Sequence, residues 1–511
     1  MIARVFSSSI LGINAYLVEV EVDIALGMPY YATVGLPEGA VRESKERIKA
    51  AVKNSGYDFP QRRIIINLAP ADIKKEGAAL DLPIAIAILA ASGFIKQENI
   101  EDYIILGELS LDGKVNPIKG ALPSALCARE RGLKGIIVPA ANSKEAAVVD
   151  GIDVIPVKTL SQVVEFLNET KEMTPVKVDL GNIFKKSADF DIDFSDVKGQ
   201  EHVKRALEIA ASGGHNILMI GPPGSGKTML ARRIPTILPD LTFDEALEIT
   251  KIHSIMGLIK KNRSLIAKRT FRSPHHSVSD AGLIGGGTIP KPGEVSLAHN
   301  GVLFLDELPE FKKNVLELLR QPMEDGEVTI SRAAVSLTYP AQSMLIAACN
   351  PCQCGFHGSR DTSNECLCTM AQVQRYRSKI SGPILDRIDI HVEVPAVKYK
   401  ELSTDFEAEP SVDIKSRVDT ARELQQERFH KTGIFCNSQM KPRHIKKHCQ
   451  IDDAGHKLLE MAVNRLGMSA RGYNRILKVS RTIADLAGVE NISPMHLSEA
   501  IQYRSLDRKM V

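Results

Sequence analysis

Residues 221–228 read Gly-Pro-Pro-Gly-Ser-Gly-Lys-Thr, and these residue types at this spacing can hold the phosphates of a nucleotide. Glycines let backbone N–H groups turn toward phosphate oxygens, and the helix that follows adds the positive end of its dipole. We expect Lys227 to reach the β- and γ-phosphates and the Thr228 hydroxyl to bind Mg²⁺. An apolar run, 217–220, precedes the stretch and a helical pattern follows it, which argues against a chance glycine-rich turn. The predicted ATP-binding residues are Gly221, Pro222, Pro223, Gly224, Ser225, Gly226, Lys227 and Thr228.

Two further strand-like runs end in polar residues that ATP hydrolysis requires. The apolar run 302–305 is followed by Asp306 and Glu307. We expect Asp306 to hold the Mg²⁺ shell and Glu307 to orient and polarise the attacking water. The alternative is a solvated acidic pair at an ordinary strand end. The next run ends in Asn350, which a parallel sheet would present to the γ-phosphate or the water.

Two arginines later in the chain are candidates for stabilising transition-state charge. Arg387 lies in "LDRID", and Arg471 stands at the start of a predicted helix, from which it could reach the same phosphates. Taken singly, each arginine also fits a solvated surface position.

Five of the eight cysteines fall within residues 349–368. Four of them form two C-x-C pairs separated by eleven residues, namely Cys352, Cys354, Cys366 and Cys368. Two close thiolate pairs can converge on one tetrahedral Zn²⁺, with His357 as a possible substitute ligand. Cys349 is expected to face the core. Because no open coordination position is suggested, we expect a structural metal that braces the ATP site, the alternative being free thiols in a loop.

The sequence pattern predicts an α/β protein with several domains. Residues 1–167 alternate strand-like runs, such as 15–24 and 62–70, with helical ones, whereas the polar stretch 168–193 is predicted to be a linker. Apolar strands alternate with helices over 194–395, which indicates a parallel sheet. Residues 396–511 are almost wholly helical.

Composition limits the classes of partner. Apolar content of 44%, charged content of 25% and a net charge of +3 are ordinary for a globular protein, so any nucleic-acid surface must be local. The N-terminus does not resemble a signal peptide, and the apolar run from Leu82 is shorter than the ~20 residues of a membrane span. The scattered remaining cysteines suit a reducing compartment. We therefore expect a cytoplasmic protein that does not bind membranes.

The order of these motifs, P-loop, "FLDE", terminal Asn, "LDRID" and "SARGYNRIL", resembles AAA+ ATPases of the magnesium-chelatase-like, helix-two-insert group. Over the whole chain the sequence resembles the YifB/ComM family of bacterial Mg-chelatase-like proteins. The resemblance implies that Asn350 is sensor 1, Arg387 the arginine finger and Arg471 sensor 2. It also implies a helical lid at the C-terminus and places Val197 and Gln200 beside the adenine.

The same resemblance implies a homohexameric ring with two segments facing its pore. These are 271–301, which resembles the helix-two insert, and 323–340, which resembles the pre-sensor-1 hairpin. The second segment alternates like a hairpin with Arg332 near its tip, a position suited to contact a DNA phosphate backbone. The alternative is a hairpin that only packs on its neighbour.

The N-terminal segments 66–91 and 105–139 resemble the α+β proteolytic domain of Lon proteases. At the position of that family's nucleophilic serine this chain has Ala79, and Leu122 and Ser124 stand where lysines would be. A Ser–Lys dyad needs both a hydroxyl and a base, so we expect the fold without the peptidase activity.

Three functions compete. The resemblance implies a hexameric, ATP-dependent motor on DNA, of helicase or branch-migration type, connected with natural transformation, that is, with uptake and recombination of foreign DNA. The alternatives are a magnesium-chelatase motor subunit, which would work with partners that insert Mg²⁺ into a porphyrin, and an ATP-dependent protease. Ala79 opposes the protease. Among ATPases that do not act on DNA, a magnesium-chelatase-like ATPase that remodels a protein partner is the runner-up.

Overall fold

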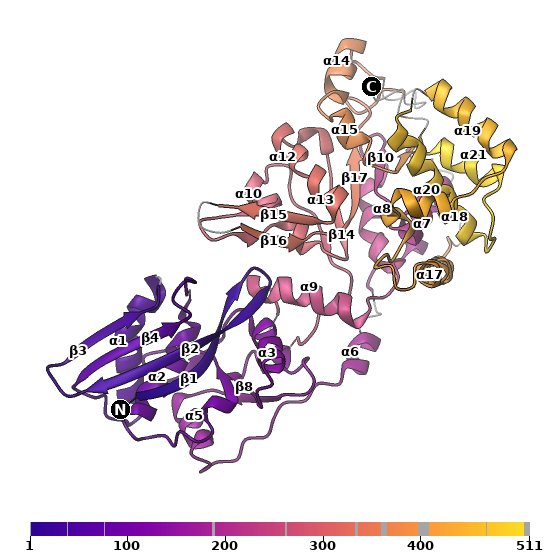
Figure 1. The fold of residues 1–511 in the computed structure, drawn as a ribbon. Helices are drawn as coiled ribbons and strands as arrows, with labels where there is room; N and C mark the ends of the chain where they lie inside the picture. Colours follow the sequence, from indigo (N-terminus) through magenta and orange to yellow (C-terminus); the bar gives the residue numbers. More distant parts are fainter. Residues whose placement is uncertain are drawn as a thin grey trace. The chain divides into compact units, whose positions relative to one another are not determined.

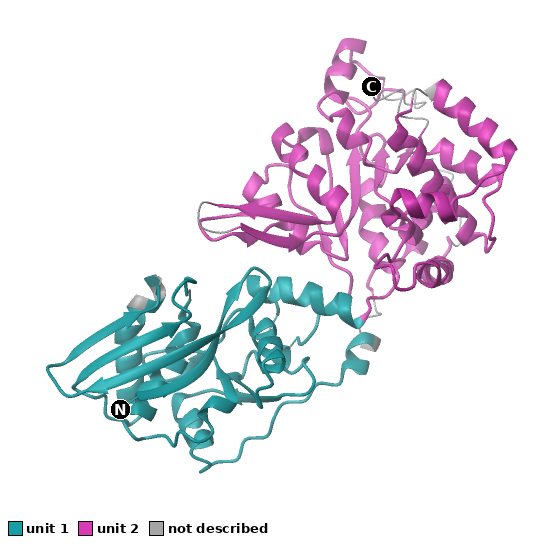
Figure 2. Cartoon of the chain, in the orientation of Figure 1, with its two compact units in different colours: residues 1–187, 243–267 teal, residues 188–242, 268–511 magenta. Residues whose placement is uncertain are grey.

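The structure is a computed structural model that describes residues 2–37, 39–75, 77–186, 190–260, 263–332, 336–358, 365–396, 408–466 and 468–504. The chain forms two compact units (Figure 2). Unit 1 comprises Met1–Ser187 and Phe243–Ala267, and unit 2 comprises Ala188–Thr242 and Lys268–Val511. Among the described residues, no helix combines the length and apolar character needed to cross a membrane.

Unit 1 is built on a seven-stranded mixed sheet in the order β3-β4-β2-β1-β5-β8-β9 (Figure 1). The β1–β2 and β2–β4 pairs are antiparallel and the other pairs are parallel. The sheet strands are β1 (Ile2–Leu11), β2 (Asn14–Ala25), β3 (Tyr30–Val34), β4 (Arg63–Ala69), β5 (Tyr103–Ile105), β8 (Gly135–Pro139) and β9 (Asp153–Val157), and β6 (Glu108–Leu109) and β7 (Val115–Asn116) form a separate pair. The predicted strands 15–24 and 62–70 are confirmed as β2 and β4.

The helices of unit 1 are α1 (Gly39–Asn54), α2 (Asp81–Ala91), α3 (Ala121–Glu130), α4 (Ser143–Ala146), α5 (Leu160–Leu167), α6 (Leu180–Lys186) and α9 (Phe243–Met256), with 3₁₀ turns η1 (Ala78–Leu80) and η2 (Ile100–Asp102). Helices α2 and α3 pack on the sheet. Every residue of α2 is buried, so the most apolar run of the chain is a core helix. Helix α6 lies inside the segment predicted to be a linker, of which residues 187–189 are outside the described part.

Helix α9 joins unit 1 although the sequence pattern placed its residues in the nucleotide-binding domain. It packs on α3, where the Gly120 backbone N–H donates to the Ser254 carbonyl over 3.2 Å. The Ser254 hydroxyl also donates to the buried Glu145 carboxylate. Burial raises the pKa of Glu145 above its usual value. These buried polar contacts hold α9 against unit 1.

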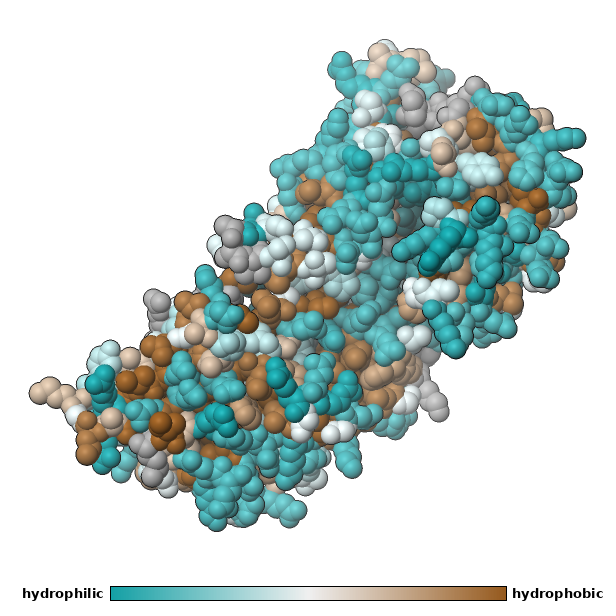
Figure 3. Space-filling view, in the orientation of Figure 1, coloured by the Kyte–Doolittle hydropathy of each residue, from teal (hydrophilic) through white to brown (hydrophobic). Residues whose placement is uncertain are grey.

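Exposed apolar side chains mark one edge of unit 1. On the face shown in Figure 3, hydrophobic residues gather over the region of β3 and β4. The exposed residues of the β2–β3 turn and of β3 include Leu26, Met28, Tyr30 and Val34. Strand β3 is an edge strand, so these side chains flank unpaired backbone groups.

Unit 2 contains a parallel sheet of five strands in the order β11-β14-β17-β10-β18. The strands are β10 (Ile217–Ile220), β11 (Phe271–Arg272), β14 (Val302–Leu305), β17 (Met344–Cys349) and β18 (Ile390–Glu393). Two hairpins lie outside the sheet, β12 (Gly285–Gly286) with β13 (Lys291–Pro292), and β15 (Glu327–Ser331) with β16 (Ser336–Pro340). The predicted parallel α/β sheet is therefore confirmed.

The helices of unit 2 cover this sheet and continue into the C-terminal helical region. They are α7 (Glu201–Gly213), α8 (Lys227–Arg233), α10 (Asp280–Leu283), α11 (Glu294–Leu297), α12 (Lys313–Leu318), α13 (Arg320–Asp325), α14 (Met370–Arg377), α15 (Gly382–Leu385), α17 (Ser411–Arg428), α18 (Pro442–His448), α19 (Asp453–Leu466), α20 (Ala470–Leu486) and α21 (Pro494–Gln502). The 3₁₀ turns are η3 (Phe194–Asp196), η4 (Ile234–Thr236), η5 (Leu308–Glu310) and η6 (Asn437–Gln439).

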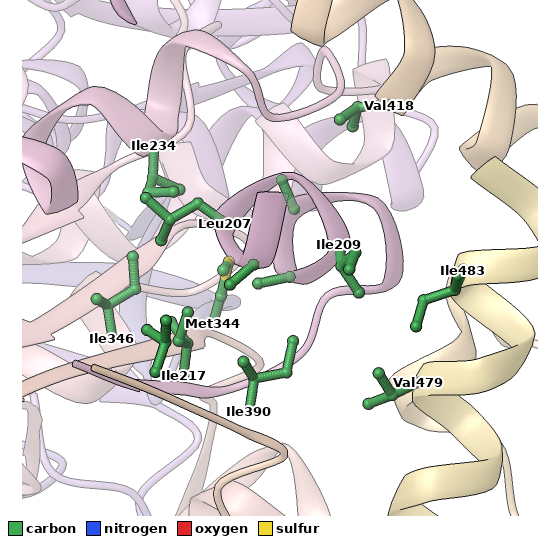
Figure 4. Packing of buried hydrophobic residues seen from close by; sticks show 14 of the residues in the cluster. Leu207, Ile209, Ile217, Ile234, Met344, Ile346, Ile390, Val418, Val479 and Ile483 are labelled. Atoms are coloured by element: carbon green, nitrogen blue, oxygen red, sulfur yellow. The ribbon is translucent and has the colours of Figure 1, made fainter. Parts of the chain in front are cut away.

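One hydrophobic core joins the sheet to the C-terminal helices (Figure 4). Helix α7 presents Leu207 and Ile209 to this core, and the strands contribute Ile217, Ile346 and Ile390. From the C-terminal helices come Val418, Val479 and Ile483. Because the two parts share buried contacts, the helical region is anchored directly to the nucleotide-binding sheet.

Candidate functional site

The candidate site is a cavity of about 420 Å³ at the carboxyl ends of the parallel strands. In a parallel sheet these ends meet along one edge, which is where α/β proteins bind ligands. The lining residues are Pro223, Gly224, Ser225, Gly226, Lys227, Thr228, Met229, Asp306, Glu307, Cys349 and Asn350. Thus the P-loop, the acidic pair and the terminal asparagine, which are up to 129 positions apart in the chain, surround one volume.

The P-loop is shaped by its glycines. Gly224 and Gly226 have φ values of 74° and 87°, in the left-handed region that residues with a Cβ rarely adopt. The Lys227 ammonium donates to the carbonyl oxygens of Gly221 at 2.7 Å and Pro222 at 2.8 Å, and to Asn350 Oδ1 at 3.2 Å. Burial lowers the pKa of Lys227. The lysine therefore lies between the loop and the asparagine, where a phosphate would be held.

The predicted Mg²⁺ residues touch each other. Thr228 Oγ1 donates to Asp306 Oδ2 at 2.7 Å, so a hydroxyl and a carboxylate are already paired at the strand end. The backbone N–H of Glu307 donates to Asp306 Oδ1 at 3.0 Å, and Glu307 has a φ of 53°. Hard oxygen ligands of this kind fit Mg²⁺.

Sequence reasoning missed His276. Its Nδ1 lies 3.4 Å from Glu307 Oε2, and its ring lies against that of His275, with centroids 4.0 Å apart and planes tilted by 35°. The sequence shows a His-His pair shortly after residues 271–272, but only the structure shows that these residues form β11 and pair in parallel with β14, the strand that leads into Glu307. The imidazole therefore faces the residue predicted to activate water.

The two residues expected beside the adenine contact protein groups. The Gln200 amide donates to the carbonyl oxygens of Ser225 and Pro395, both at 2.9 Å. Val197 is buried in the hydrophobic core of unit 2. The Gln200 side chain thus connects the P-loop to the segment that follows β18.

Arg387 and Arg471 are not among the described residues that line the cavity. Both guanidinium groups instead face Glu324 Oε1, Arg387 NH2 at 2.5 Å and Arg471 NH2 at 3.4 Å. The Arg387 side chain is 3% exposed, whereas that of Arg471 is 59% exposed. Helix α20 begins beside Arg387, so the two arginines lie together, and the expected contact of Arg471 with the phosphates stays a prediction.

A buried charge cluster attaches helix α20 to the sheet. Asp389 accepts from Arg475 NH1 at 2.5 Å and from the Asn216 backbone N–H at 3.1 Å. His215 Nε2 lies 2.8 Å from Thr482 Oγ1, while its Nδ1 lies 3.5 Å from Asp389 Oδ2. Burial alone would raise the pKa of Asp389, but Arg475 and His215 hold it well below its usual range. A charged Asp389 therefore helps fix the helix that carries Arg471.

The four cysteines of the two C-x-C pairs converge. Their sulfur atoms all lie within 4.8 Å of one another, with Cys352 3.3 Å from Cys354 and 3.8 Å from Cys366. Tetrahedral zinc with Zn–S bonds of about 2.3 Å requires sulfur–sulfur separations of about 3.8 Å. Hydrogen bonding from the Phe356 backbone lowers the pKa of Cys354 to about 6, whereas burial and the neighbouring cysteine thiols raise the pKa values of Cys366 and Cys368. The cluster is compatible with Zn²⁺.

Other residues near the cluster have different roles. His357 donates its backbone N–H to Cys352 Sγ at 3.3 Å, and its ring is not part of the converging group. Cys349 is buried, as expected, and burial raises its pKa to about 12. The middle of the cysteine loop, 359–364, lies outside the described residues.

The cysteine loop packs against the P-loop. Gly355 has a φ of 91°, and a Cβ placed on it would lie 2.5 Å from Pro223 Cδ. Only a glycine permits this close approach. On the other side, Arg377 Nε donates to the Pro351 carbonyl at 3.2 Å. The loop that carries the cysteine cluster is therefore in direct contact with the phosphate-binding loop.

The two segments expected to face a pore lie side by side. Tyr339 Oη of β16 donates to the Pro290 carbonyl at 2.7 Å. Arg332 is exposed, and a Cβ atom placed on Gly286 of β12 would lie 3.4 Å from its NH2 atom. The hairpin tip itself, 333–335, is outside the described residues.

Comparison with known proteins agrees with this geometry. The family "Magnesium chelatase, subunit ChlI" matches residues 193–402, "Subunit ChlI of Mg-chelatase" matches 20–142, and "Magnesium chelatase, subunit ChlI C-terminal" matches 408–504. Competence protein ComM of Haemophilus influenzae and protein YifB of Escherichia coli (strain K12) are each 43% identical to the chain over 99% of its length and 98% of theirs. The magnesium-chelatase 38 kDa subunit of Rhodobacter capsulatus is 25% identical over 31% of this chain and 50% of that subunit. The chain therefore belongs to the YifB/ComM family of magnesium-chelatase ChlI-like proteins, with an AAA ATPase module between a ChlI-type N-terminal domain and a C-terminal helical region.

Proposed function

We propose that this protein is a cytoplasmic ATP-dependent motor that acts on DNA as a homohexamer, of helicase or branch-migration type. The observation that carries the ATPase part is the Thr228–Asp306 contact of 2.7 Å inside a cavity also lined by Lys227, Glu307 and Asn350. The DNA part is supported by the full-length similarity to a competence protein, which connects it with natural transformation.

Five of the residues that line the cavity have a role in this proposal. Thr228 and Asp306 would hold Mg²⁺, which neutralises phosphate charge when bound. Lys227 places a positive charge against the β- and γ-phosphates of ATP, and Asn350 orients the γ-phosphate or the water. Glu307 orients the attacking water and withdraws its proton.

The hexameric part rests on where the two arginines lie. Arg387 and Arg471 are grouped around Glu324 and are not among the described residues lining the cavity of their own subunit. A second copy of the chain is the natural recipient of their charge, because transition-state stabilisation at the γ-phosphate needs such a cation. We therefore assign both arginines to the neighbouring subunit's site.

The DNA-contacting surface is proposed to be the pair of adjoining hairpins in unit 2. Arg332 and Lys291 are exposed on them, and two positive side chains on protruding hairpins suit a phosphate backbone. Because the net charge of the chain is only +3, such a local surface must supply most of the electrostatic attraction.

We also propose that Cys352, Cys354, Cys366 and Cys368 bind one structural Zn²⁺. The observed sulfur separations suit tetrahedral coordination, and four thiolates leave no open position for catalysis. Since Gly355 packs on Pro223, the bound metal would stabilise the P-loop through the cysteine loop without touching the nucleotide.

For unit 1 we propose a Lon-protease-like fold without peptidase activity. Ala79 lies in η1 and offers no hydroxyl, and Leu122 is buried in α3. Ser124 is also buried, with its hydroxyl donating to the Gly120 carbonyl at 2.7 Å. The residues at these positions supply neither the nucleophile nor the lysine base that the dyad needs.

The experiment that tests the main proposal is the steady-state ATPase rate with and without single-stranded or branched DNA. We expect DNA to stimulate hydrolysis. Glu307→Gln should keep nucleotide binding while lowering kcat by about 10²–10³-fold, because only water activation is lost. Glu310→Gln, three residues on and paired with Lys379 at the surface, is the matched control and should hydrolyse ATP normally. An ATPase that requires Glu307 but ignores DNA would instead favour a remodelling ATPase acting on a protein partner.

A further inference from the structure

Glu324 contacts the two arginines assigned to the neighbouring site and also lies next to the hairpin proposed to contact DNA. One of its carboxylate oxygens, Oε1, faces both Arg387 and Arg471, at 2.5 and 3.4 Å. A single oxygen shared by two guanidinium groups cannot offer either of them the bidentate pairing that arginine favours. In addition, Arg387 Nε is buried without a hydrogen-bond partner among the described residues. Arg387 NH1 also donates to the Pro383 carbonyl at 2.6 Å, so Glu324 is the charged acceptor that faces both cations and the one that a phosphate oxygen could replace.

The same residue lies at the root of the predicted DNA-contacting hairpin. Glu324 is in the last turn of α13, which ends at Gly326 with a φ of 71°, and β15 begins at the next residue. The Gly326 carbonyl accepts from the Ala341 backbone N–H at 2.8 Å, which ties the end of β16 to the end of α13. The start of β15 and the end of β16 are thus both tied to Gly326, two residues after Glu324. Displacement of the hairpin would therefore move Glu324.

We propose that Glu324 is a positioning residue that couples DNA contact at the β15–β16 hairpin to ATP hydrolysis in the neighbouring subunit. Without DNA, Glu324 retains Arg387 and Arg471 on its own subunit. When DNA shifts the hairpin, α13 withdraws the carboxylate and the two guanidinium groups transfer to the neighbour's γ-phosphate. This inference rests on the proposed DNA-dependent ATPase and deepens it.

The test is Glu324→Gln, which keeps the size of the side chain and removes its charge. The side chain is 44% exposed, so the fold should survive, and a thermal melt checks this. ATPase rates are measured across a titration with a mixed-sequence single-stranded oligonucleotide. We expect DNA-free kcat to rise by about tenfold, the equivalent of losing one charged hydrogen bond, with KM for ATP unchanged. Stimulation by DNA should fall below about twofold, since the arginines are already released.

The matched control is Asp325→Asn, which removes the same charge from the adjacent exposed position. It should retain the DNA-free rate and the full stimulation of the unaltered protein. Equal stimulation in Glu324→Gln and the unaltered protein would overturn the coupling. So would a fall of kcat by the same factor with and without DNA, because this indicates that Glu324 holds the arginines in their productive position. If DNA fails to stimulate the unaltered protein, the proposed DNA-dependent function itself is refuted.

Discussion

The strongest test of how the C-terminal helices are anchored is Asp389→Ala. Asp389 is buried and accepts from Arg475 and from the Asn216 backbone N–H, at 2.5 and 3.1 Å. Alanine would leave the Arg475 guanidinium, in a side chain only 18% exposed, without its counter-ion. Removing one partner of a buried ion pair costs about 3–5 kcal/mol of unfolding free energy. At about 2 °C per kcal/mol for a unit of this size, the melting temperature of unit 2 should fall by roughly 6–10 °C.

The assay is thermal unfolding at pH 7 and pH 5, with Glu427→Ala as the control for loss of an exposed carboxylate. The folded pKa of Asp389 is depressed, so its contribution is complete above the unfolded value of about 3.9 and is lost only as pH falls toward the folded pKa. The difference between variant and unaltered protein should therefore be the same at both pH values. A shift below about 2 °C at pH 7 would refute the assignment, since the buried Arg475 would then have lost no counter-ion that stabilises the fold.

Three other predictions concern the proposed motor. Mixing Arg387→Ala with Lys227→Ala subunits should restore part of the ATPase activity. In a mixed ring, one type of interface joins an intact Lys227 of one subunit to an intact Arg387 of its neighbour. No restoration at any ratio, with mixed rings verified, would argue against a finger acting on the neighbour. Arg332→Ala should weaken DNA binding regardless of sequence and make it less sensitive to salt, as measured by fluorescence anisotropy, and binding by the unaltered protein that ignores salt would reject phosphate contact. Elemental analysis of protein purified without a metal-affinity step should find about one zinc per chain, and changing both cysteines of the second C-x-C pair to serine should remove it and lower ATPase activity and thermal stability. The control Cys127→Ser should keep the metal, and metal-free protein with full activity would leave the cluster as free thiols.

Local pattern was sufficient to predict the nucleotide-binding sheet. The glycines of the P-loop, the apolar run before Asp306 and the run before Asn350 each carry their own signal, because strand ends and phosphate-binding turns depend on neighbouring residues. Once the strands are known to be parallel, their carboxyl ends must share one edge. For this reason the sequence alone predicted that Lys227, Asp306 and Asn350 would surround one cavity.

Contacts between distant segments were decided only by the tertiary structure. No periodicity shows that Glu324 would meet Arg387 and Arg471, that His276 would face Glu307, or that Gly355 would pack on Pro223. Helix α9 has an ordinary helical pattern, and its membership in unit 1 depends on buried contacts with α3 and α4. The sequence determined which residues can do chemistry, because that depends on residue type and short spacing. Packing decided which charges meet, because side chains far apart in the chain become neighbours only when their elements share a core.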